Sequence, residues 1–121
     1  MAGAMAALVV LTGCAPSSQE VTVEETVGHP LTFIDGKLGQ DAGLLVQDVS
    51  PRVGLSAGYL EGVDPEQWMI VASCSDTDDI RRATSLEVAV VPIARADEAR
   101  ALGDDLANAV DCDGRPHRAH L

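Results

Sequence analysis

Clustered aspartates are the first residues in this sequence whose spacing could support chemistry. Asp76, Asp78 and Asp79 lie close together, and clustered carboxylate oxygens are the ligands that Ca²⁺ prefers. An isoleucine and an arginine, however, interrupt the D-x-[DN]-x-[DN]-G spacing of a calcium-binding loop. We therefore expect Ser75 or Asp76 to cap a short helix, and a weak cation site is the alternative.

A second acidic group surrounds the last cysteine. Its members are Asp104, Asp105, Asp111 and Asp113. A bond between Cys74 and Cys112 would bring this group next to the first one. A shared site, in a cation-binding sensor, is one hypothesis, and a solvated acidic face is the other.

Ser56 is a candidate nucleophile. Residues 54–58, GLSAG, match the G-x-S-x-G elbow of α/β-hydrolases, which requires a strand, a sharp turn and a helix. Here the apolar and small residues alternate as in a strand, and the only candidate bases are His29, His117 and His120. We predict small residues on an exposed strand face and no catalytic residue, with a small envelope hydrolase as the alternative.

His117, His120 and Trp68 are further candidate binding residues. The two histidines are three residues apart, as in some metal sites, but the spacing places no further ligand. A single tryptophan in a strand can stack on a ligand, but more often it belongs to the core. We therefore expect no cofactor, no metal, and a core position for Trp68.

The first cysteine follows a short apolar run. Residues 4–11 are too few to span a bilayer and fit the core of a signal peptide. Residues 11–14, LTGC, resemble the lipobox of bacterial lipoproteins. This resemblance implies removal of residues 1–13 and a diacylglycerol on Cys14 that holds the protein on the outer face of the cell membrane. A chance cysteine after a cleavable secretory signal, or the edge of a buried helix, is the alternative. No Lys or Arg precedes the apolar run, so either the signal is weak or the start lies upstream of Met1.

Lipidation of Cys14 would account for the odd number of cysteines. Cys74 and Cys112 would then remain, and an exported chain meets an oxidising compartment. We predict a disulfide between these two residues. Two free buried thiols, or a metal-binding pair, are the alternatives.

Charge and composition restrict the partners. The chain has 19 acidic and 8 basic residues, for a net charge of −11, which repels nucleic-acid phosphates. We expect no nucleic-acid binding, whereas basic partners or divalent cations are electrostatically permitted. The chain has one Phe, one Tyr and one Trp, so the core must consist of Val, Leu, Ile and Ala. The preference for Arg over Lys indicates a GC-rich bacterial genome, as in actinobacteria.

Strands and helices are expected to alternate behind a tether. Residues 14–29 indicate a flexible tether of roughly 20 Å, although their three valines leave an edge strand as the alternative. The predicted strands are 31–35, 53–59, 68–72 and 86–91, the predicted helices are 38–49 and 97–110, and a turn or short helix is expected over 76–83. Gly103 is expected to divide the second helix. The domain would cover 30–113 and be followed by a loose tail, 114–121. This β-α-β-β-β-α order predicts a small α+β domain, with helices on one face of a three- to four-stranded sheet.

Residues 33–91 resemble a divergent PASTA domain, the β-α-β-β module of bacterial penicillin-binding proteins and envelope serine/threonine kinases. The residues that carry the resemblance are Ile34-Asp35-Gly36 before the helix, Ala42 and Leu45 within it, 68–71 in the third strand and 84–91 in the closing strand. Cys74-Ser75-Asp76 stands where the family has Gln-x-Pro. The resemblance implies a non-enzymatic binding module with a cell-wall or envelope partner.

Overall fold

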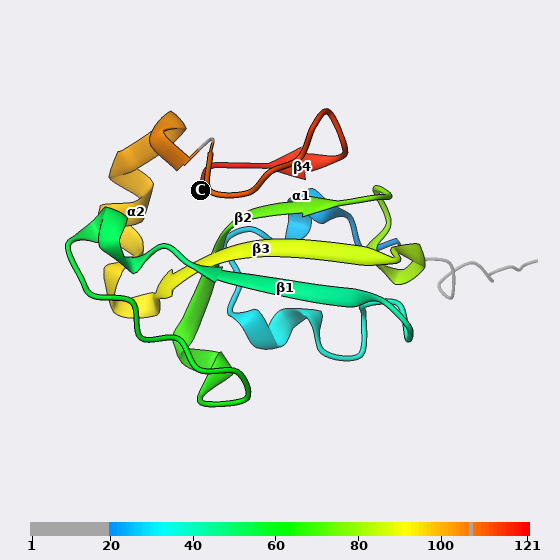
Figure 1. The fold of residues 1–121 in the computed structure, drawn as a ribbon, viewed down its shortest axis with the longest axis horizontal. Coiled ribbons are helices and arrows are strands. Elements are labelled where there is room, and N and C mark those ends of the chain that lie inside the picture. Colours follow the sequence, from blue (N-terminus) through cyan, green and yellow to red (C-terminus); the bar gives the residue numbers. More distant parts are fainter. Residues whose placement is uncertain (1–19, 107) are drawn as a thin grey trace, which may run out of the picture.

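Four strands form one mixed sheet in the part of the chain that the computed structural model describes, residues 20–106 and 108–121 (Figure 1). They are β1 (Gly43–Asp48), β2 (Trp68–Ser75), β3 (Ser85–Pro92) and β4 (His117–Arg118). Their order across the sheet is β1-β3-β2-β4, with β1 parallel to β3 and the other two pairs antiparallel. The predicted α+β class and the four-stranded sheet are confirmed.

Short helical pieces connect the strands. The α-helices are α1 (Val23–Thr26) and α2 (Ala96–Leu102). The 3₁₀ helices are η2 (Leu31–Ile34), η3 (Ser50–Val53), η4 (Pro65–Gln67), η5 (Ile80–Arg82), η6 (Ile93–Arg95) and η7 (Gly103–Leu106). None of the helices in the described ranges is long and apolar enough to cross a membrane.

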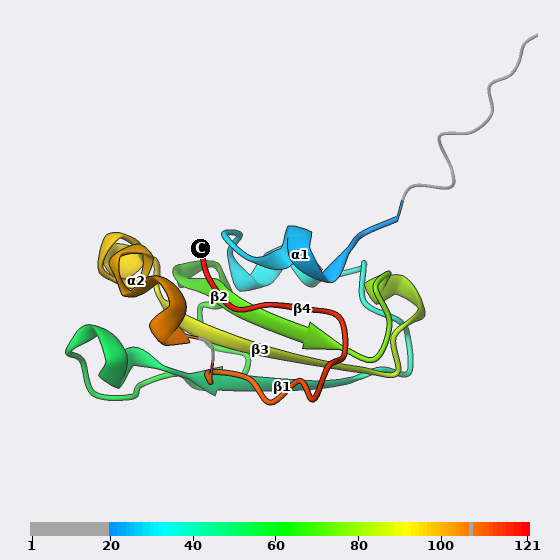
Figure 2. The same cartoon turned by 90° about the horizontal axis from the view of Figure 1, so that it is seen from above.

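The central strand β3 is buried on both faces. Leu86, Val88 and Val90 belong to one apolar cluster, which α1 and η2 also line. Ala89 and Val91 belong to the other, which α2 and η7 line. Burial on two faces explains the continuous apolar run of β3. The helical pieces therefore contribute to both clusters instead of sharing one face, and Figure 2 shows α1 over the sheet and α2 at its end.

The second half of the chain follows the predicted elements closely. The strands expected over 68–72 and 86–91 are confirmed as β2 and β3, and each is somewhat longer than expected. The short helix expected over 76–83 is η5, but its cap is Asp79 instead of Ser75 or Asp76. The last helix is shorter than predicted, and Gly103 divides it into α2 and η7, as expected.

The helix predicted over residues 38–49 is wrong, because residues 43–48 form β1 and pair with β3. The apolar residues of this stretch fit a helical stripe and a strand equally well, so the local pattern could not separate the two. Gly39 passes so close to η5 that a Cβ atom there would lie 2.7 Å from the carbonyl oxygen of Ala83. This approach brings the following residues alongside β3, where a strand can pair.

The strand predicted over residues 31–35 is also wrong, because η2 occupies this segment. Leu31 and Ile34 are both buried and lie three residues apart. That spacing places two side chains on one side of a 3₁₀ turn, whereas a strand would direct them to opposite faces.

The strand predicted over residues 53–59 is replaced by η3 and an unpaired extended segment. Hydrogen bonds to a single carboxylate, instead of to a neighbouring strand, fix the position of this segment. The backbone N–H groups of Gly58 and Tyr59 donate to Asp48 at 2.6 and 2.8 Å. Asp48 also accepts from the backbone N–H of Ser50, at 2.9 Å.

Both ends of the described chain are packed, contrary to the expected tether and loose tail. α1 begins with a capping box between Thr22 and Glu25, and Val23 is fully buried. At the other end β4 pairs with β2, where His117 lies opposite Cys74. The domain therefore includes residues on both sides of the predicted 30–113. Positions 14–19 of the predicted tether lie outside the described residues.

Candidate interaction site beside strand β1

β1 is an edge strand with one open side. Gly43 and Val49 donate their N–H groups to carbonyl oxygens of the β3 segment, at 2.9 and 3.0 Å. Alternate residues of a strand direct their backbone groups to opposite sides, so those of Leu44 and Val46 point away from β3. Within the described ranges, no other strand pairs with this open side.

Two adjacent leucines make this edge apolar on both faces. The exposed fractions of Leu44 and Leu45 are 44% and 55%. Leu44 lies opposite Leu86, and Leu45 lies opposite Glu87, so the two side chains extend from opposite faces of the sheet. An open edge with exposed leucines is a template for pairing with another chain.

A hollow of about 320 Å³ lies on the Leu45 face, and we call it the Arg115 hollow. Its lining residues are Gly43, Leu44, Leu45, Ser85, Leu86, Glu87 and Arg115. Apolar side chains of the sheet thus lie next to one carboxylate and one guanidinium group. Among the described residues, Arg115 is in no ion pair.

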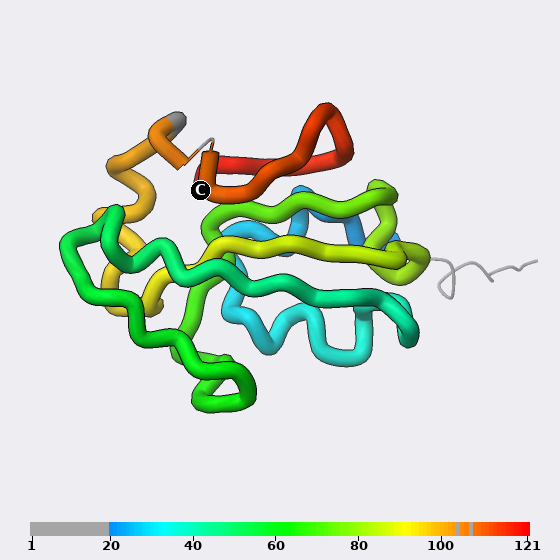
Figure 3. The backbone as a smooth tube through the Cα atoms, in the orientation of Figure 1, coloured from blue at the N-terminus to red at the C-terminus, as the bar shows by residue number. Residues whose placement is uncertain are grey.

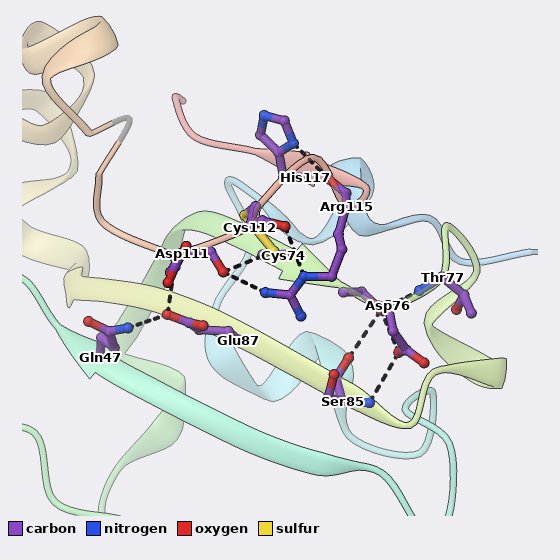
Figure 4. The surroundings of a disulfide bond; sticks show 11 residues. Gln47, Cys74, Asp76, Thr77, Ser85, Glu87, Asp111, Cys112, Arg115 and His117 are labelled. Atoms are coloured by element: carbon purple, nitrogen blue, oxygen red, sulfur yellow. Dashed lines mark hydrogen bonds between the residues drawn. A yellow bond between two sulfur atoms is a disulfide. The ribbon is translucent and has the colours of Figure 1, made fainter.

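The disulfide between Cys74 and Cys112 positions Arg115, and its Cα atoms are 5.7 Å apart. This bond confirms the predicted pairing and fixes the C-terminal segment, which turns back on itself beside β2 (Figure 3). The guanidinium group of Arg115 donates to the carbonyl oxygens of Cys112, at 2.8 Å, and Asp111, at 2.5 Å. Figure 4 shows this side chain reaching over β3 toward Glu87 and Ser85.

Glu87 joins the C-terminal segment to β1. Its carboxylate accepts a hydrogen bond from the side-chain amide of Gln47 and a longer one, at 3.4 Å, from the backbone N–H of Asp111. These contacts link three neighbouring segments on one face of the sheet. One wall of the Arg115 hollow is therefore held by covalent and hydrogen bonds.

A second hollow, of about 210 Å³, lies on the other face, and we call it the Tyr59 hollow. Its lining residues are Leu44, Leu45, Val46, Tyr59 and Glu61. Tyr59 packs edge-on against Trp68 with ring centroids 5.4 Å apart. Burial, and secondly the carboxylate of Glu61, raise the pKa of the Tyr59 phenol. Trp68 is half-buried, so it supports this hollow as well as the core.

The carboxylate of Asp48, the last residue of β1, positions Tyr59 by accepting a hydrogen bond from its backbone N–H. Burial alone would raise the pKa of Asp48, but the hydrogen bonds from Ser50, Tyr59 and Gly58 outweigh it and lower the pKa. Asp48 is therefore ionised at neutral pH and acts as a fixed acceptor for the loop. Its hydrogen bonds are structural and connect the far end of β1 to the Tyr59 hollow.

Asp76, Asp78 and Asp79, whose spacing indicated a possible cation site, make hydrogen bonds in separate turns. Asp76 accepts from the hydroxyl of Thr84 at 2.8 Å and from the backbone N–H of Ser85 at 3.1 Å, and these bonds lower its pKa. Asp78 uses its carbonyl oxygen to accept from Val23 at 2.9 Å.

Asp79 has a different set of partners. It forms an ion pair with Arg81 at 2.9 Å and accepts from the N–H of Val21 at 3.4 Å. The side-chain hydrogen bond from Arg81 is the largest of the effects that lower the pKa of Asp79 to about 2. Across residues 20–106 and 108–121, no group of three His, Cys, Asp or Glu side chains could hold a metal ion.

The other candidate residues are not brought together. Ser56 is exposed in the unpaired segment, which has neither the predicted strand nor the strand-turn-helix of an elbow. His29 stacks on Phe33, whereas Nδ1 of His117 hydrogen-bonds the carbonyl oxygen of Arg115 at 2.8 Å. His120 contributes its carbonyl oxygen to a hydrogen bond from Arg118. Cys14 lies outside the described residues.

The site at β1 was not anticipated from the sequence. The run Leu44-Leu45-Val46 held one usable signal, because adjacent leucines on a half-buried strand cannot both face the core. Arg115 gave no signal, since its position depends on the disulfide and on the return of the C-terminal segment. Comparison with known protein families, curated proteins and solved structures finds no match for this chain.

Proposed function

We propose that this protein is a membrane-anchored lipoprotein whose extracytoplasmic domain is a non-enzymatic binding module of the cell envelope. The observation that carries the binding role is the open edge of β1, with exposed leucines between two hollows. Soluble domains usually protect such an edge with charges, proline or a covering segment. An edge left apolar and open favours a partner that covers it.

The anchor rests on the LTGC motif at residues 11–14 and on the chain that follows it. From Cys14 to Glu20 the backbone can extend at most roughly 20 Å, so a lipid on Cys14 would keep the domain near the bilayer. Val21 joins the domain beside Asp79. β1 begins at this same end, where Gly43 bonds the carbonyl of Thr84, and would run outward from the membrane.

The non-enzymatic role is supported by the separation of the candidate catalytic groups. Ser56 is exposed on a loop, and no hydrogen bond joins it to a histidine among the described residues. The helix predicted around Ala42 and Leu45 is a strand, so the element order differs from that of the PASTA resemblance.

Lipidation is tested by mass spectrometry of the membrane fraction. We expect a mature terminus at Cys14 that carries acyl mass, and a Cys14→Ser variant that loses both the mass and membrane attachment. A wild-type chain that is soluble, unmodified and begins at another residue would contradict the anchor.

The binding role is tested by photocrosslinking in intact cells, with a photoreactive amino acid at position 45 and Cys14 intact. The matched control carries the same group at Asp97, whose side chain is 94% exposed on α2. We expect one or a few defined protein adducts from position 45 and none of them from position 97. Identical adduct patterns at the two positions would rule out β1 as the binding edge.

A further inference from the structure

We infer that the open edge of β1 binds an extended peptide segment in which apolar and basic residues alternate. This inference rests on the proposed binding function and specifies the ligand class for that site. Leu44 and Val46 direct unpaired backbone groups outward, so an added strand can hydrogen-bond to them. The segment would become the fifth strand of the sheet, next to β1.

The two hollows match the alternation of an added strand. Side chains of a strand point in turn to its two faces. On one face they would reach the Arg115 hollow beside Leu45, and on the other the Tyr59 hollow beside Leu44. A peptide paired with β1 would therefore place every second side chain in the same chemical environment.

The Arg115 hollow suits an apolar side chain. Leu45 supplies exposed apolar surface, while Glu87 and Arg115 contribute opposite charges on the same wall. Two donors of Arg115 are already engaged with carbonyl oxygens of the C-terminal segment. The hollow thus offers apolar contact without a net charge from its lining.

The Tyr59 hollow suits a lysine or arginine. Its lining joins the Tyr59 ring and Leu44 to the exposed carboxylate of Glu61, and it contains no basic residue. The methylene stem of a long basic side chain can lie on the leucine while its charge reaches the carboxylate. An aromatic ring adds attraction for the same cation. Exposed Asp41, just before β1, extends the negative charge along the edge.

Charge also favours a basic peptide segment over a second copy of the chain as the partner. A pair of these domains would bring together two molecules of net charge −11, with Asp41 and Glu61 beside the interface of each. A basic segment instead gains from this charge during encounter and in the complex. A peptide with acidic residues at the alternate positions would be repelled.

The test uses an acetylated and amidated heptapeptide of alternating Lys and Leu, titrated into the full mature protein. Trp68 is the only tryptophan and contacts Tyr59, so its fluorescence reports on occupation of the site. We expect saturable binding that weakens as salt is added, because exposed charges are screened. The same peptide with Glu in place of Lys should not bind, and equal binding of the two would overturn the inference.

Backbone pairing is tested with two N-methylated versions of this peptide, one methylated on the Lys amides and one on the Leu amides. In an added strand, one set of amides faces β1 and the other faces solvent. We expect one version to lose binding and the other to keep it. Equal effects of the two methylation patterns would overturn strand addition.

Two pairs of protein variants locate the site. Glu61→Gln should weaken binding by up to about fivefold, the scale of one exposed ion pair. Glu66→Gln, an exposed carboxylate outside both hollows, should leave binding unchanged. Leu45→Asp should weaken binding more than tenfold, roughly the loss of a buried leucine contact, whereas Leu60→Asp should not.

The oligomeric state tests whether a peptide segment or a second copy of the chain occupies the edge. Sedimentation equilibrium should give a monomer of the mature chain, and a dimer abolished by Leu45→Asp would overturn the inference in favour of self-pairing. A defined crosslink at position 45 together with no peptide binding would refute the ligand class while leaving the proposed function intact. Loss of that crosslink would instead remove the proposed function.

Discussion

The two edges of the sheet are treated in opposite ways. The β4 edge is two residues long, and the disulfide at Cys112 ties its segment to β2. Arg118 on this edge donates to the carbonyl oxygens of Glu24 in α1, at 3.4 Å, and of His120, at 2.9 Å. The β1 edge is six residues long and carries two exposed leucines. No described strand pairs with its outer side, away from β3.

The β4 edge is protected from pairing with another chain, whereas the β1 edge is available for it. A short strand, held by a covalent bond and by α1, offers little backbone for another chain to pair with. The β1 edge has backbone groups, apolar surface and two hollows available together. The same domain therefore closes one edge to contact and leaves the other open, which directs any strand addition to β1.

Removal of the disulfide should produce the largest change, and it should act on the β4 edge. A bond that closes a loop of 38 residues is worth about 4 kcal/mol in the chain-entropy model, which is an upper-end value. We expect the Cys74→Ser/Cys112→Ser variant to lose up to this free energy of unfolding in urea titrations. The oxidised wild-type protein, once denatured, should contain no free thiol at either position.

Hydrogen exchange on the same variant distinguishes the two edges at individual amides. The amide of Ser75, which bonds the carbonyl of Pro116, should lose protection along with the rest of the β4 pairing. The amide of Val49, bonded to Val90, should exchange as slowly as the reduced global stability allows. Equal opening of the β1–β3 and β2–β4 pairs, beyond the global change, would contradict the idea of a covalently protected edge.

Two leucine truncations compare the buried C-terminal side with the open edge. Leu106 is fully buried in the cluster that also holds Cys74, so Leu106→Ala should cost about 3 kcal/mol. Leu45→Ala, on an exposed side chain, should change the free energy of unfolding by less than about 0.5 kcal/mol. Thermal and urea unfolding measure both. A large loss on Leu45→Ala would mean that β1 keeps its leucines for stability and not for a partner.

The smallest expected effect concerns pH and the attachment of the amino-terminal segment at Asp79. The pKa of Asp79 is about 2 in the folded chain, against an ordinary value of 3.8. Because the folded pKa is depressed, this group stabilises the fold above pH 3.8, and the contribution is lost as pH falls toward 2. Asp79→Asn should flatten this part of a stability-against-pH profile. A profile unaltered by Asp79→Asn would show that the carboxylate has no such role.

Some of the fold could be predicted from local sequence. β2 and β3 are dense apolar runs that suit burial on both faces, so their pattern had one physical interpretation. The disulfide was predicted from the cysteine count, on the expectation that Cys14 carries lipid, and the Cys74–Cys112 bond confirms it. The candidate site was not predicted, because spacing along the chain gave weight to Asp76, Asp78 and Asp79, whose contacts close turns.

The remaining elements depended on contacts distant in sequence. A strand exists only with a partner, and β1 and β4 pair with segments about forty residues away. The apolar positions over 38–49 suited a helix as well as a strand, so the local pattern could not identify β1. The capping box of α1 was present in the sequence, but burial of Val23 decided that this segment belongs to the domain.

Four features follow from the sequence alone: the acidic charge, the apolar central strands, the predicted cysteine pair and the amino-terminal motif. These depend on residue types and on short-range pattern, which need no knowledge of neighbours. Which edge is open depends on the tertiary structure, because backbone groups are free or paired according to the strand beside them. The tertiary structure also brought Arg115 next to Glu87 and Leu45, since a disulfide and a returning chain place residues that the sequence keeps far apart.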